Sequence, residues 1–371
     1  MRGADTLVIG GGLVGAAIAY GLARRGVSTI VIDEGDVAFR ASRGNFGLVW
    51  VQGKGDGMPD YAAWTRLSAD LWPRFAEELG AETGIGTVYD KPGGFFLCRS
   101  EAELAEQEAR LQRIRAKNTA PGPDYEVLDH KALAERLPGL GPAVIGGTYC
   151  PHDGHCNPLF LLRALHVGHT ALGGRYLPNR KVGDIRPEAG GFTVVTDGGK
   201  VQGDRVVLAA GLGSARLAPK LGLSVPVVPQ RGQVLVTQRA APRLAHPTVY
   251  VRQTGEGSFL LGDSHEDVGF DEGTTPEAMT FIARRSLDFF PFLAELPVVR
   301  VWGALRVMTP DGFPVYDLSR EHPGAFSAAC HSGVTLAAAH AERLAGFVAE
   351  GALPAEFQGF SADRFDVQEA A

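Results

Sequence analysis

Three glycines and one acidic residue near the amino terminus have the types and the spacing that nucleotide binding requires. Gly10, Gly12 and Gly15 occupy the first, third and sixth positions of a G-x-G-x-x-G run. The first glycine of such a run permits a tight turn, the second lets the backbone approach a pyrophosphate, and the third lets a helix pack closely on a strand. Asp33, further along, is placed to accept hydrogen bonds from the hydroxyls of a ribose. These residues predict a dinucleotide site.

The elements that must position these residues can be read from the sequence as well. Thr6–Ile9 is an apolar, β-branched run typical of a buried parallel strand. Ala16–Arg25 is rich in small apolar residues and predicts a closely packed helix, which Gly26 ends. Ser28–Ile32 is a second strand that leads into the acidic residue. A strand, a glycine run, a helix, a strand and an acid in this order are much more specific than the glycines alone.

A loop with two glycines follows, and it contains Arg43, Gly44, Asn45, Phe46 and Gly47. A protein that binds only a nicotinamide cofactor would continue here with further βα units. The extended loop instead favours a chain that runs beside a long ligand, because loops with glycines near a nucleotide commonly line it. The alternative is an ordinary surface loop.

The rest of the chain indicates a second domain inserted into the first. Helices predicted at Tyr61–Gly80 and Glu101–Lys117 flank Val88–Cys98, which is typical of a β-hairpin. Further strands, such as Gln233–Thr237 and Val298–Val307, predict a largely antiparallel sheet. The predicted fold class is therefore α/β, with a Rossmann-like domain formed by residues 1–54, 140–224 and 306–371. An α+β domain formed by residues 55–139 and 225–305 is inserted into it.

Two later segments return to the first domain. Arg205–Gly211 is an apolar strand that ends in small residues, as expected of a strand that passes close to a cofactor. Ala325–Ala329 predicts another strand, and Cys330–Gly333 predicts a sharp turn into a helix at Val334–Glu350. The start of that helix would point its partial positive charge at the cleft.

Composition and charge exclude several classes of function. The chain has 371 residues, 45% of them hydrophobic, and a net charge of −6 without a long run of Lys or Arg, so nucleic acid is not an expected partner. It has no apolar run of membrane-spanning length and no signal-peptide pattern. We therefore expect a soluble cytoplasmic protein without a transmembrane segment. Its 4 cysteines are too few and too scattered for a disulfide framework.

The segment from Cys150 to Pro158 contains two cysteines and two histidines and could suggest a metal site. Zinc sites usually pair a short ligand spacing with a second, distant pair, which is absent here. The better interpretation is a turn, with Asn157 as the N-cap and Pro158 at the first position of a helix over Leu159–Gly168. We predict no metal.

Several segments in order resemble the D-amino-acid oxidase superfamily of FAD-dependent amine oxidoreductases, which includes glycine oxidase, sarcosine oxidase and D-amino-acid dehydrogenases. The similarity covers nearly the whole chain. The run Gly47–Gln52, together with Cys330–Leu336, is most similar to β subunits of heteromeric opine and D-hydroxyproline dehydrogenases. The segments that carry the superfamily resemblance are Val8–Gly15, Val206–Gly211, Pro229–Gln233, Trp302–Arg306, Thr309–Pro314 and His331–Thr335.

The resemblance implies that the Rossmann-like domain binds FAD and that the inserted domain binds the substrate. Asp33 would hold the adenosine ribose, although the family more often has Glu there, with Glu34 as the alternative. The backbone of Val182 would meet the adenine, and amides of Gly333 and Val334 would meet the pyrimidine edge of the flavin. The residues implied in cofactor binding are Gly10, Gly12, Leu13, Val14, Gly15, Asp33, Glu34, Arg43, Gly44, Asn45, Phe46, Gly47, Val182, Ala210, Gly211, Arg306, Ser332, Gly333, Val334 and Thr335.

The resemblance also implies roles toward the substrate. Arg306 matches the arginine that binds the substrate carboxylate in glycine oxidase, and its planar guanidinium suits two parallel hydrogen bonds to a carboxylate. The alternative is a structural ion pair on the sheet. His331 would orient the substrate or modulate the flavin, or it is simply a turn histidine. Trp50 would form a wall of the substrate pocket, or it fills the core.

The expected function is FAD-dependent oxidation of the C–N bond of an amino acid, a cyclic imino acid or an opine-like secondary amine. Electrons would leave through a partner subunit or another acceptor than oxygen, because the sarcosine oxidase lysine that assists oxygen would fall near Leu260. The alternatives are an oxygen-using oxidase and an FAD-containing relay subunit of a heteromeric complex. The histidine that carries covalent FMN in heteromeric sarcosine oxidase is absent near Asn157 and Pro158, so any FMN at a subunit boundary would be non-covalent.

Overall fold

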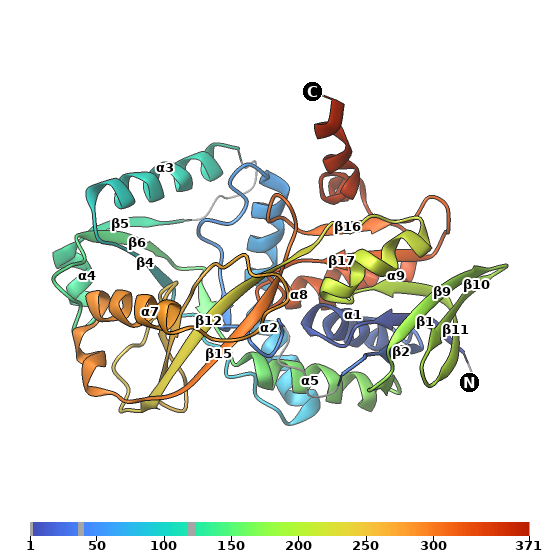
Figure 1. Ribbon diagram of the computed structural model, residues 1–371, viewed down its shortest axis with the longest axis horizontal. Coiled ribbons are helices and arrows are strands. Elements are labelled where there is room, and N and C mark those ends of the chain that lie inside the picture. The colour runs from blue at the N-terminus through green and yellow to red at the C-terminus, as the bar shows by residue number, and fades with distance from the viewer. Residues whose placement is uncertain (1–2, 36–40, 118–123, 371) are drawn as a thin grey trace.

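The amino-terminal strand lies in the middle of an eight-stranded sheet (Figure 1). The computed structural model describes residues 3–35, 41–117 and 124–370. The strands follow the order β16-β17-β11-β1-β2-β8, and β9 and β10 extend the sheet from β11. Neighbours from β17 to β8 are parallel, whereas β16, β10 and β9 join in antiparallel fashion. The bounds are β1 Ala4–Ile9, β2 Thr29–Ile32, β8 Arg175–Leu177, β9 Val182–Glu188, β10 Gly191–Thr196, β11 Gly199–Leu208, β16 Val315–Leu318 and β17 Ala325–Ala329.

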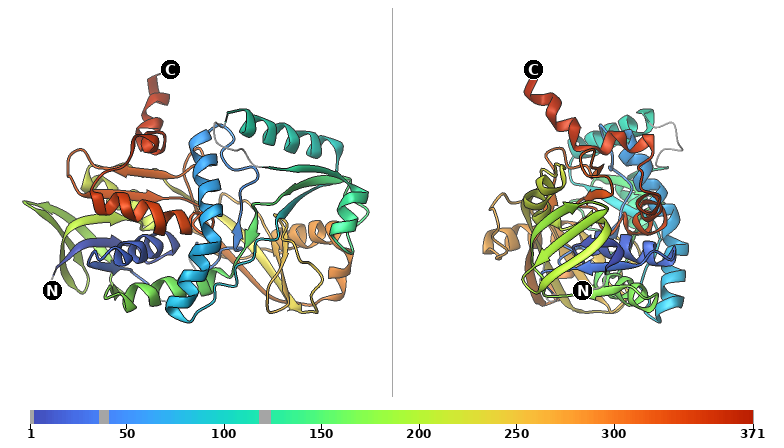
Figure 2. Two further views of the ribbon diagram at one scale, coloured as in Figure 1. Left: turned by 180° about the vertical axis from the view of Figure 1, so that it is seen from behind. Right: turned by 90° about the vertical axis from the view of Figure 1, so that its right-hand side faces the viewer.

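Helices cover one face of this sheet. The helix after the glycine run, α1 (Leu13–Arg24), packs against α5 (Pro158–Ala171) and α9 (Ala345–Glu350), and the three lie side by side in Figure 2. Apolar side chains of the strands alternate between this face and the opposite one, which packs against residues 217–227. The sheet is therefore buried on both sides, as expected of parallel strands. Short helices complete this half: η1 Gly211–Gly213, α6 Ser214–Leu217, η2 Ala218–Leu221, η5 Ala355–Phe360 and η6 Ala362–Ala370.

The predicted helix over Val334–Glu350 forms later and less regularly than expected. Turns occupy residues 333–336, and the regular helix α8 covers only Ala337–Ala339. A π-helical segment, η4 (His340–Leu344), then leads into α9. π segments are wider than an α-helix and are not encoded by a 3.6-residue period, so sequence periodicity could not predict one.

Close contact between α1 and the carboxyl-terminal helices depends on Gly21. A Cβ atom at this position would lie 2.1 Å from the carbonyl oxygen of Ala341. We therefore expect Gly21→Ala to lower the free energy of unfolding by about 1–3 kcal/mol through overpacking. Gly80→Ala is the matched control, because the nearest atom to its Cβ would be 3.8 Å away, and it should be neutral or stabilising by about 0.5–1 kcal/mol. Denaturant midpoints of the two variants decide this, and equal midpoints would contradict the packing argument.

The second half of the molecule contains two further antiparallel sheets. One has the order β13-β14-β12-β15 and the other β4-β6-β5, and a two-stranded ribbon joins β3 to β7. Helix α2 runs between the two halves of the molecule (Figure 2). The bounds are β3 Leu48–Val49, α2 Pro59–Thr83, β4 Gly94–Cys98, α3 Glu101–Lys117, β5 Glu126–Asp129, α4 His130–Arg136, β6 Gly146–Cys150, β7 Gly154–His155, β12 Val228–Arg239, β13 Val251–Gln253, β14 Ser258–Gly262, α7 Pro276–Phe289, η3 Pro291–Glu295 and β15 Val298–Met308.

One predicted element in this half is wrong. Val88–Cys98 is not a hairpin: only its second part forms a strand, β4, and that strand pairs with β6. The turn residues are present, but the partner strand comes from much later in the chain. Our division into two domains remains a proposal. We would move two of its boundaries, because β6 pairs with β4 and β5, and because β15 continues to Met308.

The prediction for the Cys150–Pro158 segment is confirmed at the helix start. Asn157 Oδ1 accepts hydrogen bonds from the amides of Leu159 and Phe160, and Pro158 is the first residue of α5. Within the described ranges, no group of three or more His, Cys, Asp or Glu side chains is placed to hold a metal ion. None of the helices in those ranges combines the length and the apolar character needed to span a bilayer.

Candidate active site

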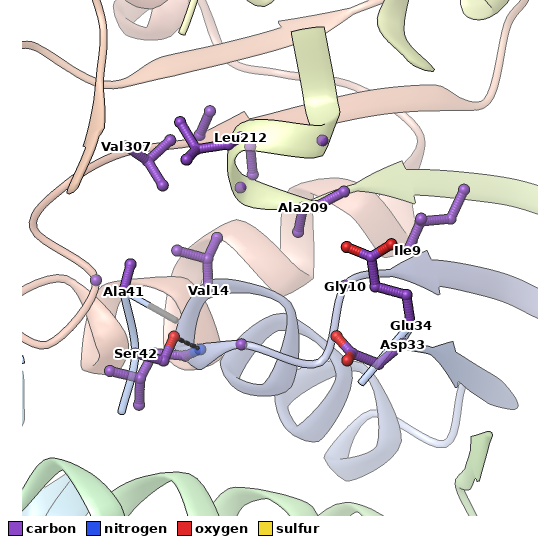
Figure 3. A pocket seen from close by; sticks show the side chains of 18 of the residues that line it. Ile9, Gly10, Val14, Asp33, Glu34, Ala41, Ser42, Ala209, Leu212 and Val307 are labelled. Carbon is purple, nitrogen blue, oxygen red and sulfur yellow. Dashed lines mark hydrogen bonds between the residues drawn. The ribbon is translucent and has the colours of Figure 1, made fainter. Parts of the chain in front are cut away.

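A cavity of about 530 Å³ lies at the carboxyl ends of β1, β2 and β11 (Figure 3). In open α/β sheets this is the edge at which ligands bind. The start of α1, the residues that follow β2 and the segment after β11 all contribute to its wall; we call it the trough. The predicted cofactor residues that line it are Gly10, Gly12, Leu13, Val14, Asp33, Glu34, Asn45, Val182, Ala210, Gly211 and Gly333.

Glycine is needed for a different structural reason at each of the three positions at the base of the trough. Gly10 has a φ of +105°, and a Cβ there would lie 2.3 Å from the carbonyl oxygen of Ala209. A Cβ on Gly15 would lie 1.9 Å from the carbonyl oxygen of Gly10, so both glycines are required by the fold itself. Gly12 has ordinary backbone angles, with φ −71° and ψ −178°, and lines the trough. Its missing side chain therefore leaves room for a ligand, as the pyrophosphate of a dinucleotide requires.

Asp33 supports the glycine turn directly. Its Oδ2 accepts a hydrogen bond of 2.7 Å from the amide of Gly11, and its Oδ1 accepts one of 2.9 Å from the amide of Gly35. The carboxylate of Glu34 also lines the trough (Figure 3). The role of Asp33 or Glu34 toward a ribose stays a prediction, and both remain in position for it.

A hydroxyl and three basic residues in the trough were not predicted from the sequence. Ser42 Oγ accepts a hydrogen bond of 2.9 Å from the amide of Leu13, which Figure 3 shows as a dashed line. Arg216 donates to the carbonyl oxygen of Val182 at 2.8 Å and so fixes the backbone proposed to meet the adenine. Arg180 and Lys181 also line this end, and their positive charge suits a phosphate-bearing ligand. Their sequence neighbourhood only indicated a strand.

A second cavity of about 310 Å³, which we call the chamber, adjoins the trough. Ala41, Asn45, Leu305, Val307 and His331 line both cavities. The chamber brings together all three residues predicted to act on the substrate, Trp50, Arg306 and His331. The other predicted residues that line it are Gly44, Asn45, Phe46, Ser332, Val334 and Thr335.

Three predicted residues, Gly15, Arg43 and Gly47, are not among the described residues that line either cavity. Gly15 lies beneath the glycine turn, as described above. Gly47 has a φ of +91°, and a Cβ there would lie 2.5 Å from the carbonyl oxygen of Cys156. Gly47 therefore allows the loop that lines the chamber to pack closely against the segment at Cys156.

Arg306, on β15, already has a carboxylate partner. Its Nη2 lies 2.6 Å from Asp263 Oδ2, and its Nη1 donates to the carbonyl oxygen of Ser264 at 2.9 Å. His265 contacts the same carboxylate at 3.1 Å. Burial alone would raise the pKa of Asp263, but the hydrogen bond from His265 and the charges of Arg306 and Arg285 hold it below its usual range. The structure thus contains an ion pair, which was the alternative to a role in substrate binding. The same guanidinium nevertheless lines the chamber, so a role in substrate binding stays a prediction.

The turn after β17 presents to both cavities three backbone amides that have no acceptor among the described residues. The first helical hydrogen bond of this segment runs from the amide of Leu336 to the carbonyl oxygen of Ser332 at 3.0 Å. The amides of Gly333, Val334 and Thr335 therefore precede the helical ladder and are available to an acceptor. Although the regular helix begins only at Ala337, the arrangement can still stabilise negative charge on a ligand.

The loop that carries Trp50 is fixed by a buried carboxylate. The amide of Trp50 donates to Thr335 Oγ1 at 3.1 Å. Asp153 Oδ1 accepts from the amide of Val51 at 2.5 Å, and its Oδ2 accepts from Gln52 Nε2 at 2.6 Å. Burial raises the pKa of Asp153 to about 7, although these hydrogen bonds lower it in part.

This raised pKa predicts a pH dependence of stability. Between the usual value of 3.8 and about 7, folded Asp153 holds a proton that the unfolded chain has lost. The contribution of protonated Asp153 to the free energy of unfolding is therefore present at low pH and is lost as the pH rises through this window. We expect the stability advantage of the wild type over Asp153→Asn to be larger at pH 5 than at pH 8, by on the order of 2 to 4 kcal/mol. Urea midpoints at the two pH values measure it, and parallel curves would contradict it.

Comparison with known proteins places the fold and the site in a family. Residues 5–346 match the DAO family, described as FAD dependent oxidoreductase. Because the match covers most of the chain, the protein belongs to this family and is an FAD-dependent oxidoreductase. The family and the fold class predicted from the sequence are confirmed, and so is FAD as the cofactor.

Individual relatives are similar over the full length. The chain is 44% identical over 366 residues to one of the subunits of opine oxidase from Agrobacterium tumefaciens (strain Ach5), and the match covers 99% of each chain. It is 27% identical over 333 residues to glycine oxidase of Geobacillus kaustophilus (strain HTA426), covering 88% of this chain and 87% of the relative. The crystal structure of glycine oxidase from Geobacillus kaustophilus superimposes with a TM-score of 0.88 at 26% identity, covering 97% of this chain and 98% of that one.

Proposed function

We propose that the protein oxidises the C–N bond of an amino acid, a cyclic imino acid or an opine-like secondary amine. The observation that carries the proposal is the chamber, which places the Arg306 guanidinium next to the trough and shares His331 with it. The relatives support it, since one is named as a subunit of opine oxidase and another as glycine oxidase. A carboxylate-bearing amine bound by Arg306 would lie at the junction of the two cavities.

FAD, when bound, supplies the acceptor for the hydride that leaves the substrate carbon. The residues of this chain hold and orient the reactants. The glycine turn and the start of α1 would bind the pyrophosphate, and the amides of Gly333 and Val334 would stabilise negative charge at the pyrimidine edge of the flavin. Arg306 would bind the substrate carboxylate, while Trp50 and His331 would limit the position of the amine.

We further propose that electrons pass to a partner subunit or to another acceptor than oxygen. The relative that is 44% identical is named as one subunit of an oxidase, which supports a multi-subunit enzyme. The position near Leu260, where a lysine would assist oxygen in sarcosine oxidase, is a buried leucine on β14. Non-covalent FMN at a subunit boundary stays a prediction. An oxygen-using oxidase remains the second candidate, because the curated relatives include glycine oxidases.

An anaerobic bleaching screen tests this function. The FAD-loaded protein would be mixed with amino acids, N-alkyl amino acids, cyclic imino acids and opines, and the flavin absorbance followed. We expect at least one carboxylate-bearing amine to bleach the flavin. Recovery of colour in air would identify an oxidase, whereas recovery only with an added dye would identify a dehydrogenase. A protein that binds FAD but is bleached by none of these amines would overturn the proposal and favour a relay subunit.

A further inference from the structure

Lys54 is a second cationic residue in the wall of the chamber, and none of the roles described above involves it. It follows the Trp50 loop and lines the same 310 Å³ cavity as Arg306 and His331. Burial, and then the positive charges of Arg110 and Arg306, lower the pKa of Lys54 to about 8 from 10.5. The Lys54 side chain is half-buried, and the cavity that it lines is where a ligand could reach it.

The hydrogen-bond partners of the Lys54 amine are neutral. Its Nζ donates to His331 Nε2 and to Ser332 Oγ, each at 3.2 Å. Burial and the charges of Lys54 and Arg306 hold the pKa of His331 well below its usual value, so this imidazole is uncharged at pH 7. In the part of the chain that the structure describes, lysine–carboxylate ion pairs are formed by Lys91 and Lys220 and not by Lys54.

The two cations of the chamber therefore differ in whether a carboxylate is paired with them. Arg306 is paired with Asp263 at 2.6 Å, whereas Lys54 forms no ion pair among the described residues, and the carboxylate of Asp153 acts on it only from beyond ion-pair distance. A charge held away from water without a partner costs free energy, and a ligand that brings the opposite charge recovers it. The chamber thus contains an ammonium group without a paired carboxylate in the described part of the chain, and an anionic group of the ligand could pair with it.

We propose that Lys54 binds a second carboxylate of the substrate and so selects amines with two carboxylates over amines with one. The inference rests on the proposed function, because it takes the chamber as the site of an amine substrate. Arg306 binds the carboxylate next to the carbon that is oxidised, and Lys54 binds the carboxylate on the other side of the nitrogen. His331 and Ser332, which accept hydrogen bonds from Lys54, act as positioning residues that hold its ammonium toward the cavity.

Two inert ligands that differ by one carboxylate test this assignment. Thiodiacetate and (methylthio)acetate both carry sulfur in place of the amine nitrogen, so neither can be oxidised as an amine. Their dissociation constants would be measured with the FAD-loaded protein by calorimetry. We expect Lys54→Met to weaken thiodiacetate binding by about 10- to 100-fold, the loss of one hydrogen-bonded charge pair, and (methylthio)acetate binding by less than about threefold. Lys131→Met, which removes an exposed lysine on α4, is the matched control and should change neither constant.

The pH dependence separates a cationic role from any other. Thiodiacetate needs protonated Lys54, so wild-type affinity should fall about tenfold per pH unit above pH 8. The titratable groups around Lys54 are Arg110 and Arg306, which lower its pKa, and Cys330 and Asp153, which raise it. The Lys54→Arg variant keeps the neighbouring groups unchanged, but its guanidinium stays protonated in this pH range. The affinity of this variant for thiodiacetate should therefore stay level up to pH 9.5.

The outcomes distinguish this inference from the proposed function. Equal losses for both ligands in Lys54→Met, or no loss for either, would overturn the assignment of Lys54. So would an affinity of Lys54→Arg that falls with pH in parallel with the wild type, which would point to a different titrating group. The bleaching screen is independent: a wild type that binds thiodiacetate through Lys54 but is bleached by no amine would refute the proposed function alone. Flavin content per chain shows whether each variant has kept its cofactor.

Discussion

Replacing Gly12 with valine is expected to leave a folded protein that no longer retains FAD. The backbone at Gly12 has ordinary angles, so valine can adopt them without a strained φ. Its Cβ would point at Ser42 Oγ, 2.8 Å away, and the methyl groups would occupy the base of the trough where a pyrophosphate would approach. We expect the affinity for FAD to fall by about 100-fold or more, which corresponds to about 2.7 kcal/mol. Flavin content after dialysis and titration of the apoprotein with FAD measure it.

Gly86→Val is the matched control for this experiment. The position is exposed, and a Cβ there would meet no atom within 4 Å. The control should bind FAD like the wild type and have the same circular dichroism spectrum as Gly12→Val. If Gly12→Val kept a full complement of flavin, the trough would not be the site of the pyrophosphate.

The second large effect concerns the ion pair of Arg306 and Asp263. Removing the guanidinium and removing the carboxylate should change the ligand affinity in opposite directions. Arg306→Met removes the guanidinium, and we expect the dissociation constant of (methylthio)acetate to rise by about 10- to 100-fold. Asp263→Asn removes the internal carboxylate that occupies Arg306 at 2.6 Å. Its effect should be the opposite, with binding about three- to tenfold tighter, because the ligand no longer displaces a charged competitor.

Calorimetric titration of both variants distinguishes a binding site from a structural ion pair. Arg239→Met removes an exposed guanidinium from the neighbouring strand β12 and controls for the loss of one positive charge. If Asp263→Asn weakened ligand binding as much as Arg306→Met does, the pair would serve the sheet and not the ligand. In that case Arg306 would no longer be a candidate for binding the substrate.

Local patterns in the sequence were sufficient for the amino-terminal part of the nucleotide-binding half. The strand, the glycine turn and the helix near the amino terminus are consecutive, and each depends on residues within a few positions of it. The helix start at Asn157 is similar, since its side chain bonds amides two and three residues away. In such cases the sequence determines the geometry almost by itself.

The chamber could be predicted only in part, because contacts between distant residues create it. Arg306 was found through its resemblance to a family motif, but its partner Asp263 lies 43 residues away. Lys54 and His331 are 277 residues apart, and no local pattern indicates that they meet. The wrong hairpin prediction has the same cause, since β4 pairs with a strand that comes much later in the chain.

The internal pairing of Arg306 also has a consequence for the resting enzyme in a salty medium. A tethered carboxylate such as Asp263 competes at an effective concentration of at least the millimolar range, and dilution cannot lower it. We therefore expect chloride, acetate and similar ions to be weak inhibitors, because each would have to displace an anion that cannot diffuse away. Only a molecule that gains further contacts in the same step can open the pair, so the site discriminates against the abundant small ions of its surroundings before any chemistry begins.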